Sequence, residues 1–296
     1  MERQKIGFIG FGEVGRVFAR EMKNRGAEVY YYDIVEKKRE GWIPLLSLDG
    51  LIQTCDIILS TVVSQVAIGV AREASRYLNS EKTYADMNST SASVKKEIAK
   101  IIEKSDANFI EGAILSAVGE TGSRAAILVS GKEAREFSRL MNELGLVNLK
   151  YFSPHIGEAS MVKMIRSVFS KGLECLLLEM LVAGRRAGVA DYLWKDVVDF
   201  MTKNSFDRVA QNWIKTHPGA CERRYHEMVQ VRETLEEIGV EPLMTRATMD
   251  FFERSRAMRL ENVFQTKPED YWDVVNLMEE KLSPEGGARF HFGSTE

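Results

Sequence analysis

The sequence is poor in cysteine and has no long hydrophobic run. Its 296 residues include three scattered cysteines, Cys55, Cys175 and Cys221, with no CxxC spacing. This set indicates neither a disulfide framework nor a zinc or redox pair, so we expect buried free thiols in a reducing cytoplasm. No stretch of about 18 apolar residues is present, which predicts no membrane span. No basic region followed by an apolar segment precedes the first strand-like run, so we expect no secretory signal.

An excess of positive charge is also missing. Lys and Arg total 40, Asp and Glu total 43, and the net charge at pH 7 is −3. A balanced chain without a basic tail gives no indication of nucleic-acid binding. No His/Glu pair at i, i+4 surrounds an expected pocket, and we expect no metal site. The length is that of one large domain or two ordinary ones.

The sequence does contain a glycine-rich turn near its start. Gly10, Gly12 and Gly15 form a GxGxxG pattern. Gly10 permits a tight turn out of a strand, and Gly12 lets a pyrophosphate approach the backbone. Gly15 lets the following helix lie close to the sheet. The N-terminus of that helix offers free N–H groups and a positive dipole end to phosphates.

The context of this turn favours a dinucleotide site over a tight turn alone. An apolar strand at 5–9 precedes it, an amphipathic helix follows it, and a second strand at 28–32 ends at Asp33. A carboxylate there accepts a hydrogen bond from a ribose 2′-OH and repels a 2′-phosphate, so NAD is favoured over NADP. The basic residues 37–39 follow closely and could admit NADP. The expected cofactor contacts are Gly10, Phe11, Gly12, Glu13, Val14, Gly15 and Asp33, joined by Thr61, Val62 and Val63.

Short strands alternate with helices in the first half of the chain. The expected strands are 5–9, 28–32, 56–61, 83–86, 108–111, 125–130 and 147–151, and the expected helices between them include 65–78, 93–104 and 133–144. This alternation predicts a doubly wound α/β domain, with a mostly parallel sheet and helices on both faces.

The second half predicts helices only. They are expected at 157–186, 192–201, 206–213, 221–238, 242–255 and 269–281. At 1.5 Å per residue the first would be about 45 Å long, so we expect it to join two domains or to form a dimer interface. We therefore predict a dinucleotide-binding Rossmann domain at 1–155 and an all-helical substrate or dimerisation domain at 156–296.

Three loops follow expected strand ends, where open α/β sheets bind their ligands. Residues 61–63 are small and apolar, suited to a wall beside ribose and nicotinamide or to an ordinary strand end. Asn88 and Ser89 could orient a substrate, or their loop could simply cap the next helix. Ser116 and Ala117 lie in a loop that is either a third substrate contact or a plain turn.

The long helix carries a polar face. Lys163, Ser167 and Lys171 are spaced i, i+4 and i+8, so they share one side of it. In a partly desolvated pocket beside other cations, Lys163 would have a lowered pKa and could exchange a proton near neutral pH. The alternative is a solvated basic face.

Further cations are expected at the start of a later helix. Arg223, Arg224 and His226 lie there. They could be ordinary surface charge, or a guanidinium could bind a substrate carboxylate through paired hydrogen bonds.

Taken together, these motifs resemble those of the β-hydroxyacid dehydrogenase family, which includes 6-phosphogluconate and 3-hydroxyisobutyrate dehydrogenases. The resemblance covers nearly the whole chain. The segment 7–12 (GFIGFG) is similar to the family's cofactor motif, 86–89 (DMNS) to its substrate loop, and 115–117 (LSA) to its Val-Ser-Gly-Gly motif. The segment 157–163 is similar to its catalytic helix start. The subgroup resembled has a phosphogluconate-dehydrogenase-like NAD-binding domain and a C-terminal domain of unknown function.

The resemblance implies that Lys163 is the catalytic general acid/base and that Asn88 and Ser116 orient the substrate. Four positions depart from the family pattern. Asn88 replaces a hydroxyl residue, Ala117 and Val118 replace two glycines, and Ser167 replaces an asparagine. The expected substrate contacts are Asn88, Ser89, Ser116, Ala117, Ser167 and Lys171.

The sequence thus predicts a cytoplasmic NAD(P)-dependent oxidoreductase. It would transfer a hydride between the nicotinamide and a small, carboxylated 3-hydroxy acid or its carbonyl counterpart. The alternatives are an imine reductase and a non-catalytic dinucleotide sensor. Because the second half carries more apolar surface than such a domain needs, we also expect a homodimer or a higher homo-oligomer.

Overall fold

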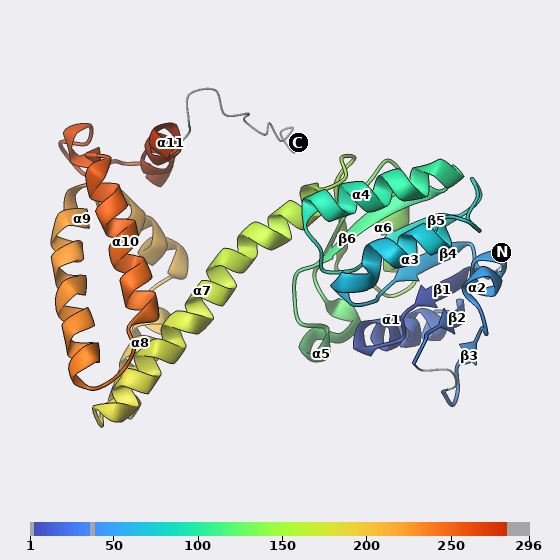
Figure 1. The fold of residues 1–296 in the computed structure, drawn as a ribbon, viewed down its shortest axis with the longest axis horizontal. Coiled ribbons are helices and arrows are strands. Elements are labelled where there is room, and N and C mark those ends of the chain that lie inside the picture. The colour runs from blue at the N-terminus through green and yellow to red at the C-terminus, as the bar shows by residue number, and fades with distance from the viewer. Residues whose placement is uncertain (1–2, 36–38, 283–296) are drawn as a thin grey trace. The chain divides into compact units, whose positions relative to one another are not determined.

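The fold comes from a computed structural model, which describes residues 3–35 and 39–282 (Figure 1). The chain divides into two compact units, Met1–Phe169 and Ser170–Glu296. Within the described residues, none of the helices combines the length and the apolar character that crossing a membrane requires.

The first unit is built on an eight-stranded sheet with the order β3-β2-β1-β4-β5-β6-β7-β8. Every neighbouring pair is parallel except β6–β7. Parallel neighbours end at the same edge, so the loops after β1, β4 and β5 meet there. The strands are β1 (Lys5–Ile9), β2 (Glu28–Tyr32), β3 (Ile43–Pro44), β4 (Ile57–Ser60), β5 (Thr83–Asp86), β6 (Asn108–Ile114), β7 (Ile127–Ser130) and β8 (Leu149–Ser153).

Helices cover both faces of this sheet. Strand side chains alternate between the faces, so Phe8 packs into one core with α1 and α6, and Ile58 into the other with α2, α3 and α4. The first-unit helices are α1 (Glu13–Asn24), α2 (Leu48–Thr54), α3 (Ala67–Ala74), α4 (Ala92–Ile102), α5 (Val118–Thr121) and α6 (Ala134–Glu143). This confirms the predicted doubly wound α/β fold.

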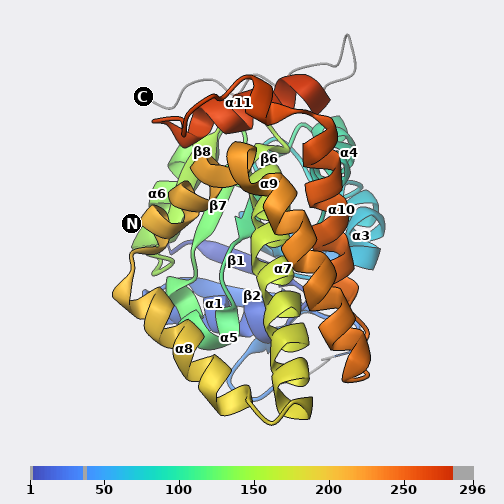
Figure 2. The same cartoon turned by 90° about the vertical axis from the view of Figure 1, so that its left-hand side faces the viewer.

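The described part of the second unit is helical, as predicted. The long helix α7 (Glu158–Arg186) begins in the first unit and ends in the second. It is followed by α8 (Ala190–Lys203), α9 (Phe206–Glu237), α10 (Leu243–Ala257) and α11 (Tyr271–Leu282). Helices α9 and α10 lie side by side, as both views show (Figure 2).

Two predictions about the second half are wrong. The expected helices 206–213 and 221–238 are a single helix, α9, which continues through Pro218. Arg223, Arg224 and His226 therefore lie within a helix rather than at its start. Helix packing overrides the preference of proline for helix ends here.

The prediction that all three thiols are buried is also wrong. Cys55 and Cys221 are buried, whereas Cys175 is exposed.

Candidate functional site

The glycine turn has the geometry that its sequence predicts. Gly10 has a φ of +83°, and a Cβ there would lie 2.8 Å from Val62 Cγ1. A Cβ on Gly15 would lie 2.8 Å from the Gly10 carbonyl oxygen. Both positions exclude a side chain, Gly10 through its left-handed backbone and Gly15 through the close approach of α1 to the end of β1.

The turn is open where a phosphate would approach it. A Cβ on Gly12 would have no neighbour within 4 Å, and no side chain caps the N-terminus of α1. Uncapped N–H groups at a helix start bind anions through hydrogen bonds and the helix dipole. These features fit the pyrophosphate of a dinucleotide.

Asp33 is held beside this turn by two backbone groups. The N–H of Phe11 donates to Asp33 Oδ2 at 2.6 Å, and the N–H of Val35 donates to Asp33 Oδ1 at 2.8 Å. Phe11 is itself buried and stacks on Tyr31 with ring centroids 4.1 Å apart. The carboxylate is therefore fixed at the end of β2, as ribose recognition requires. Of the nearby cations, Lys37 and Lys38 lie outside the described residues.

A cleft of about 680 Å³ opens at this edge of the sheet. It brings together residues from separate predicted loops: Glu13, Val14, Thr61, Val62, Val63, Asn88, Ser89, Ser116, Ala117 and Lys163. The sequence-based interpretation did not single out Gln65, Met87 and Glu120, which also line it. A concave site with a few convergent polar groups is the usual form of a small-molecule site.

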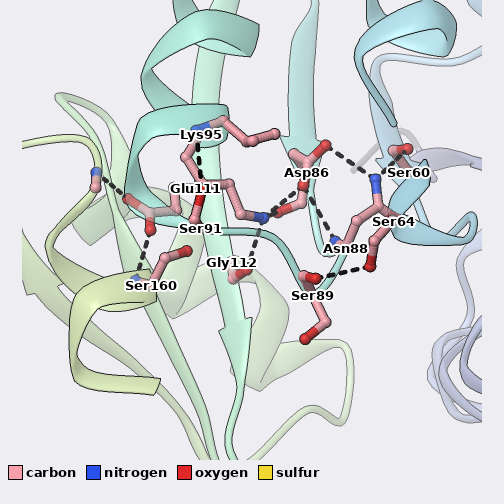
Figure 3. Close-up of polar contacts among 12 residues, drawn as sticks. Ser60, Ser64, Asp86, Asn88, Ser89, Ser91, Lys95, Glu111, Gly112 and Ser160 are labelled. Carbon is pink, nitrogen blue, oxygen red and sulfur yellow. Dashed lines mark hydrogen bonds and ion pairs between the residues drawn. The ribbon is translucent and has the colours of Figure 1, made fainter. Parts of the chain in front are cut away.

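A buried ion pair joins α4 to the end of β5 (Figure 3). Lys95 Nζ is 2.5 Å from Asp86 Oδ1, and both side chains have no exposed surface. Lys95 also donates to the carbonyl oxygens of Asp86 at 2.8 Å and Gly112 at 3.1 Å. These contacts compensate the ammonium that burial would otherwise destabilise.

Sequence reasoning did not identify Lys95, although a signal was present. Lys95 shares a helical face with Ile98, Ala99 and Ile102, which are buried. A lysine in phase with such residues cannot reach water from the middle of that face, so a buried partner is expected.

Asn88 connects this pair to the cleft. Its Nδ2 donates to Asp86 Oδ2 at 2.9 Å and to Ser60 Oγ at 3.0 Å. Its Oδ1 is buried without a hydrogen-bond partner, although the residue lines the cleft. Ser91 caps α4 by accepting from the N–H of Val94 at 3.4 Å. The loop therefore caps a helix and also places Asn88 at the cleft.

Lys163 is half-buried in the same cleft. Burial lowers the pKa of its ammonium to about 8, and the positive charge of Lys95 contributes to the same shift. Desolvation and a neighbouring cation both favour the neutral amine. Lys163 is thus suited to exchange a proton near neutral pH.

The start of α7 is fixed on the sheet by Glu111. This buried carboxylate of β6 accepts hydrogen bonds from the N–H groups of Gly157 and Ser160, the latter at 2.6 Å (Figure 3). Arg166 Nη1 donates to the Leu115 carbonyl oxygen at 2.5 Å. Lys163 lies between these two attachments, so its backbone position is set by the sheet.

The remaining predicted substrate residues differ in their placement. Ser116 Oγ accepts from the N–H of Ala126 at 2.9 Å and still lines the cleft. Ser167 Oγ donates to the Lys163 carbonyl oxygen at 3.0 Å, in its own helix. Lys171 is 75% exposed, pairs with Glu174 at 2.9 Å, and does not line the cleft. Ser116 and Lys163 thus line the same cleft, whereas Lys171 lies at the surface.

Comparison with known proteins agrees with this fold. Residues 5–147 match the NAD binding domain of 6-phosphogluconate dehydrogenase, and residues 185–255 match a domain of unknown function, DUF1932. The chain is thus an NAD(P)-binding protein of the Rossmann type.

Three known proteins are similar to this chain over most of its length. One solved structure, a conserved protein described as similar to 3-hydroxyacid dehydrogenases, is 30% identical, with a TM-score of 0.56 over 87% of this chain and 98% of that one. The 2-(hydroxymethyl)glutarate dehydrogenase of Eubacterium barkeri is 23% identical over 276 residues, covering 86% of this chain and 90% of its own. An imine reductase from Pseudomonas sp. shares the fold, with a TM-score of 0.71 over 94% of this chain and all of its own at 17% identity.

The chain belongs to the β-hydroxyacid dehydrogenase family of oxidoreductases. Its subgroup combines the NAD-binding domain of 6-phosphogluconate dehydrogenase with the C-terminal domain of unknown function.

Proposed function

We propose that this protein is an NAD-dependent dehydrogenase or reductase that interconverts a small, carboxylated 3-hydroxy acid and its carbonyl counterpart. The observation that carries the proposal is Lys163. It lines the cleft that begins at the glycine turn, and its pKa is lowered to about 8. A lysine of that pKa is partly neutral and partly charged near pH 7–8, so it can accept a proton during oxidation and donate one during reduction.

The chemistry divides between cofactor and protein. A bound nicotinamide supplies the redox step by accepting or giving a hydride. During oxidation, Lys163 Nζ takes the proton of the substrate hydroxyl as a C=O bond forms. During reduction, the charged Lys163 gives a proton to the carbonyl oxygen. Oxidation should therefore accelerate, and reduction slow, as pH rises through about 8.

Two further groups are proposed to orient the substrate. Asn88 presents an amide whose Oδ1 has no protein partner, and its Nδ2 is held by Asp86 and Ser60. Ser116 retains a hydroxyl at the opposite loop. Groups held by the fold lose little entropy when they bind a ligand, which favours accurate positioning.

The cofactor and substrate classes follow from separate observations. The fixed Asp33 carboxylate favours NAD, because it accepts from a ribose 2′-OH and repels a 2′-phosphate. A family relative is named as a dehydrogenase of 2-(hydroxymethyl)glutarate, which supports a small carboxylated hydroxy acid. We place the enzyme in the cytoplasm, where its free thiols would remain reduced.

The proposal also includes the oligomeric state of the protein. Helices α7 and α8 expose large apolar side chains, including Val168, Leu178 and Tyr192. Monomeric proteins rarely leave so much apolar surface in water. We therefore propose a homodimer or higher homo-oligomer.

The function is tested by turnover on a panel of 3-hydroxy acids with NAD and with NADP. We expect activity with NAD, and a loss of at least 100-fold in kcat for Lys163→Ala with the dissociation constant of NADH unchanged. The matched control is Lys100→Ala, an exposed lysine of α4 that removes the same charge. It should retain activity.

Other outcomes select the alternatives. Turnover that survives Lys163→Ala contradicts the assignment of the base. Reduction of cyclic imines without turnover of hydroxy acids points to an imine reductase. NADH binding without turnover of either class favours a dinucleotide sensor.

A further inference from the structure

A second pocket, in the helical unit, concentrates positive charge. It has a volume of about 500 Å³ and lies between the middle of α9 and residues 264–268. Its lining contains four cations and neither Asp nor Glu; the cations are Lys215, Arg223, Arg224 and Lys267. In a chain of net charge −3, four such groups around one concavity create a local positive potential.

Most of this charge has no acidic partner. Arg223 forms an ion pair with Glu227. Lys215 Nζ donates to the Glu269 carbonyl oxygen at 3.3 Å, and Lys267 Nζ donates to Asn212 Oδ1 at 2.7 Å. Neutral oxygens satisfy these donors but leave the charges uncompensated.

Arg224 likewise has only neutral hydrogen-bond partners. Its guanidinium donates to the Trp213 carbonyl oxygen at 3.3 Å and to Thr216 Oγ1 at 2.7 Å. Over residues 3–35 and 39–282, no carboxylate pairs with Arg224, Lys215 or Lys267. Three cations therefore face the pocket with neutral partners only.

The helix itself makes room for a ligand here. Pro218 has no N–H, so the Ile214 carbonyl oxygen lacks its usual donor within α9. Pro218, Gly219 and Ala220 all line the pocket, and a Cβ on Gly219 would have no neighbour within 4 Å. Small residues thus form one part of the lining of the pocket.

We propose that this pocket binds the phosphate group of a small anion, as a site separate from the dinucleotide turn. A phosphate monoester carries about −1.5 to −2 charge at pH 7 and three acceptor oxygens. Three uncompensated cations match that charge better than the single charge of a carboxylate. The Arg224 guanidinium and the hydroxyl of Thr266, which both line the pocket, supply directional donors.

The test is calorimetric titration at low ionic strength with inorganic phosphate and, separately, with glycerol 3-phosphate. Saturating NADH is present to occupy the α1 N-terminus. We expect saturable binding to the wild-type protein, weakened at least tenfold by Lys215→Gln with Lys267→Gln. Glutamine can still donate to Glu269 O and Asn212 Oδ1, so the fold should be kept.

The control is Lys195→Gln with Lys203→Gln on α8, which removes two charges outside the pocket. It should change the affinity less than twofold. Tighter binding of glycerol 3-phosphate identifies an organic ester as the ligand, and equal binding identifies free phosphate. Absence of saturable binding, or an equal loss in both double variants, overturns the proposal.

Discussion

Two lysines of the first unit show how surroundings decide the role of a residue. Lys95 is fully buried and has a carboxylate partner, Asp86, at 2.5 Å. Lys163 is half-buried, and among the described residues no ion pair joins it to a carboxylate. Burial and the nearby positive charge of Lys95 lower the pKa of Lys163 to about 8, because both favour its neutral form. The two lysines thus differ in their burial and in whether a carboxylate pairs with them.

This difference predicts an effect on stability that requires no substrate. The pKa of Lys163 is near 10.5 in the unfolded chain and about 8 in the folded one. Between these values the unfolded state binds more protons, so the stability of the wild-type protein rises with pH there. Replacing Lys163 by Met removes this penalty, and the variant should be more stable at pH 7 by about 1–2 kcal/mol, after discounting for partial exposure.

Denaturant unfolding at several pH values measures the effect. The advantage of Lys163→Met should be full below pH 8 and should shrink as pH rises toward 10.5. Lys100→Met accounts for the loss of one positive charge at an exposed site. If the difference in free energy of unfolding between Lys163→Met and the wild-type protein does not change with pH, the pKa of Lys163 is not lowered.

At the scale of elements, two helices are capped by carboxylates distant in sequence. Glu111 accepts from the N–H groups of Gly157 and Ser160 at the start of α7. Glu179, on α7, accepts from the N–H of Met244 at 2.7 Å and of Thr245 at 2.9 Å at the start of α10. A negative charge at a helix N-terminus satisfies free N–H groups and complements the dipole. Each cap therefore fixes a helix to a neighbouring element.

The cap on α7 makes Glu111 a positioning residue for Lys163. Glu111→Gln keeps the shape of the side chain but removes its negative charge and one of its two acceptor oxygens. The variant should therefore be less stable than the wild-type protein by about 1–3 kcal/mol. It should also lower kcat about tenfold or more with little change in the dissociation constant of NADH, because the glycine turn is untouched.

The matched control for this prediction is Glu158→Gln. Glu158 lies in the first turn of the same helix, and its loss removes the same charge. A purely electrostatic effect of the helix end would make both variants alike. Equal kcat values for the two variants would show that Glu111 does not position Lys163.

Elements were predictable where pattern and packing agree. The strands 5–9, 28–32 and 83–86 have the predicted bounds, because each is a short apolar run with clear breakers. The β3 strand, of two residues, and the short helix α5 are too brief to show a period. The break expected near Pro218 did not occur, since tertiary packing keeps α9 continuous.

The two halves of the site differ in how far the sequence predicts them. The cofactor half is formed by residues close together in the sequence. Gly10, Gly12 and Asp33 lie within one βαβ unit, and the role of each residue type in dinucleotide binding is known. The substrate half is assembled from chain segments far apart. Glu111, for example, holds the start of α7 across 46 and 49 residues. No local pattern encodes such contacts.

At the scale of the whole molecule, unpartnered apolar surface predicts self-association. Leu178 and Val182 are one helical turn apart on α7, and their exposed fractions are 58% and 50%. On α8, Tyr192 and Trp194 are also exposed, at 74% and 49%. Burying a side chain of this size contributes about 1.5–3 kcal/mol, so several together can hold a symmetric interface.

Sedimentation velocity at micromolar concentration should therefore show a dimer or larger species and no dominant monomer. Leu178→Glu with Val182→Glu should shift the protein to monomer, because two carboxylates would have to be buried without partners. Arg185→Glu is the matched control, since it changes the net charge of α7 by the same two units without removing apolar surface. A wild-type protein that sediments only as monomer contradicts the prediction. If Arg185→Glu dissociates the assembly equally, charge rather than apolar burial holds it together.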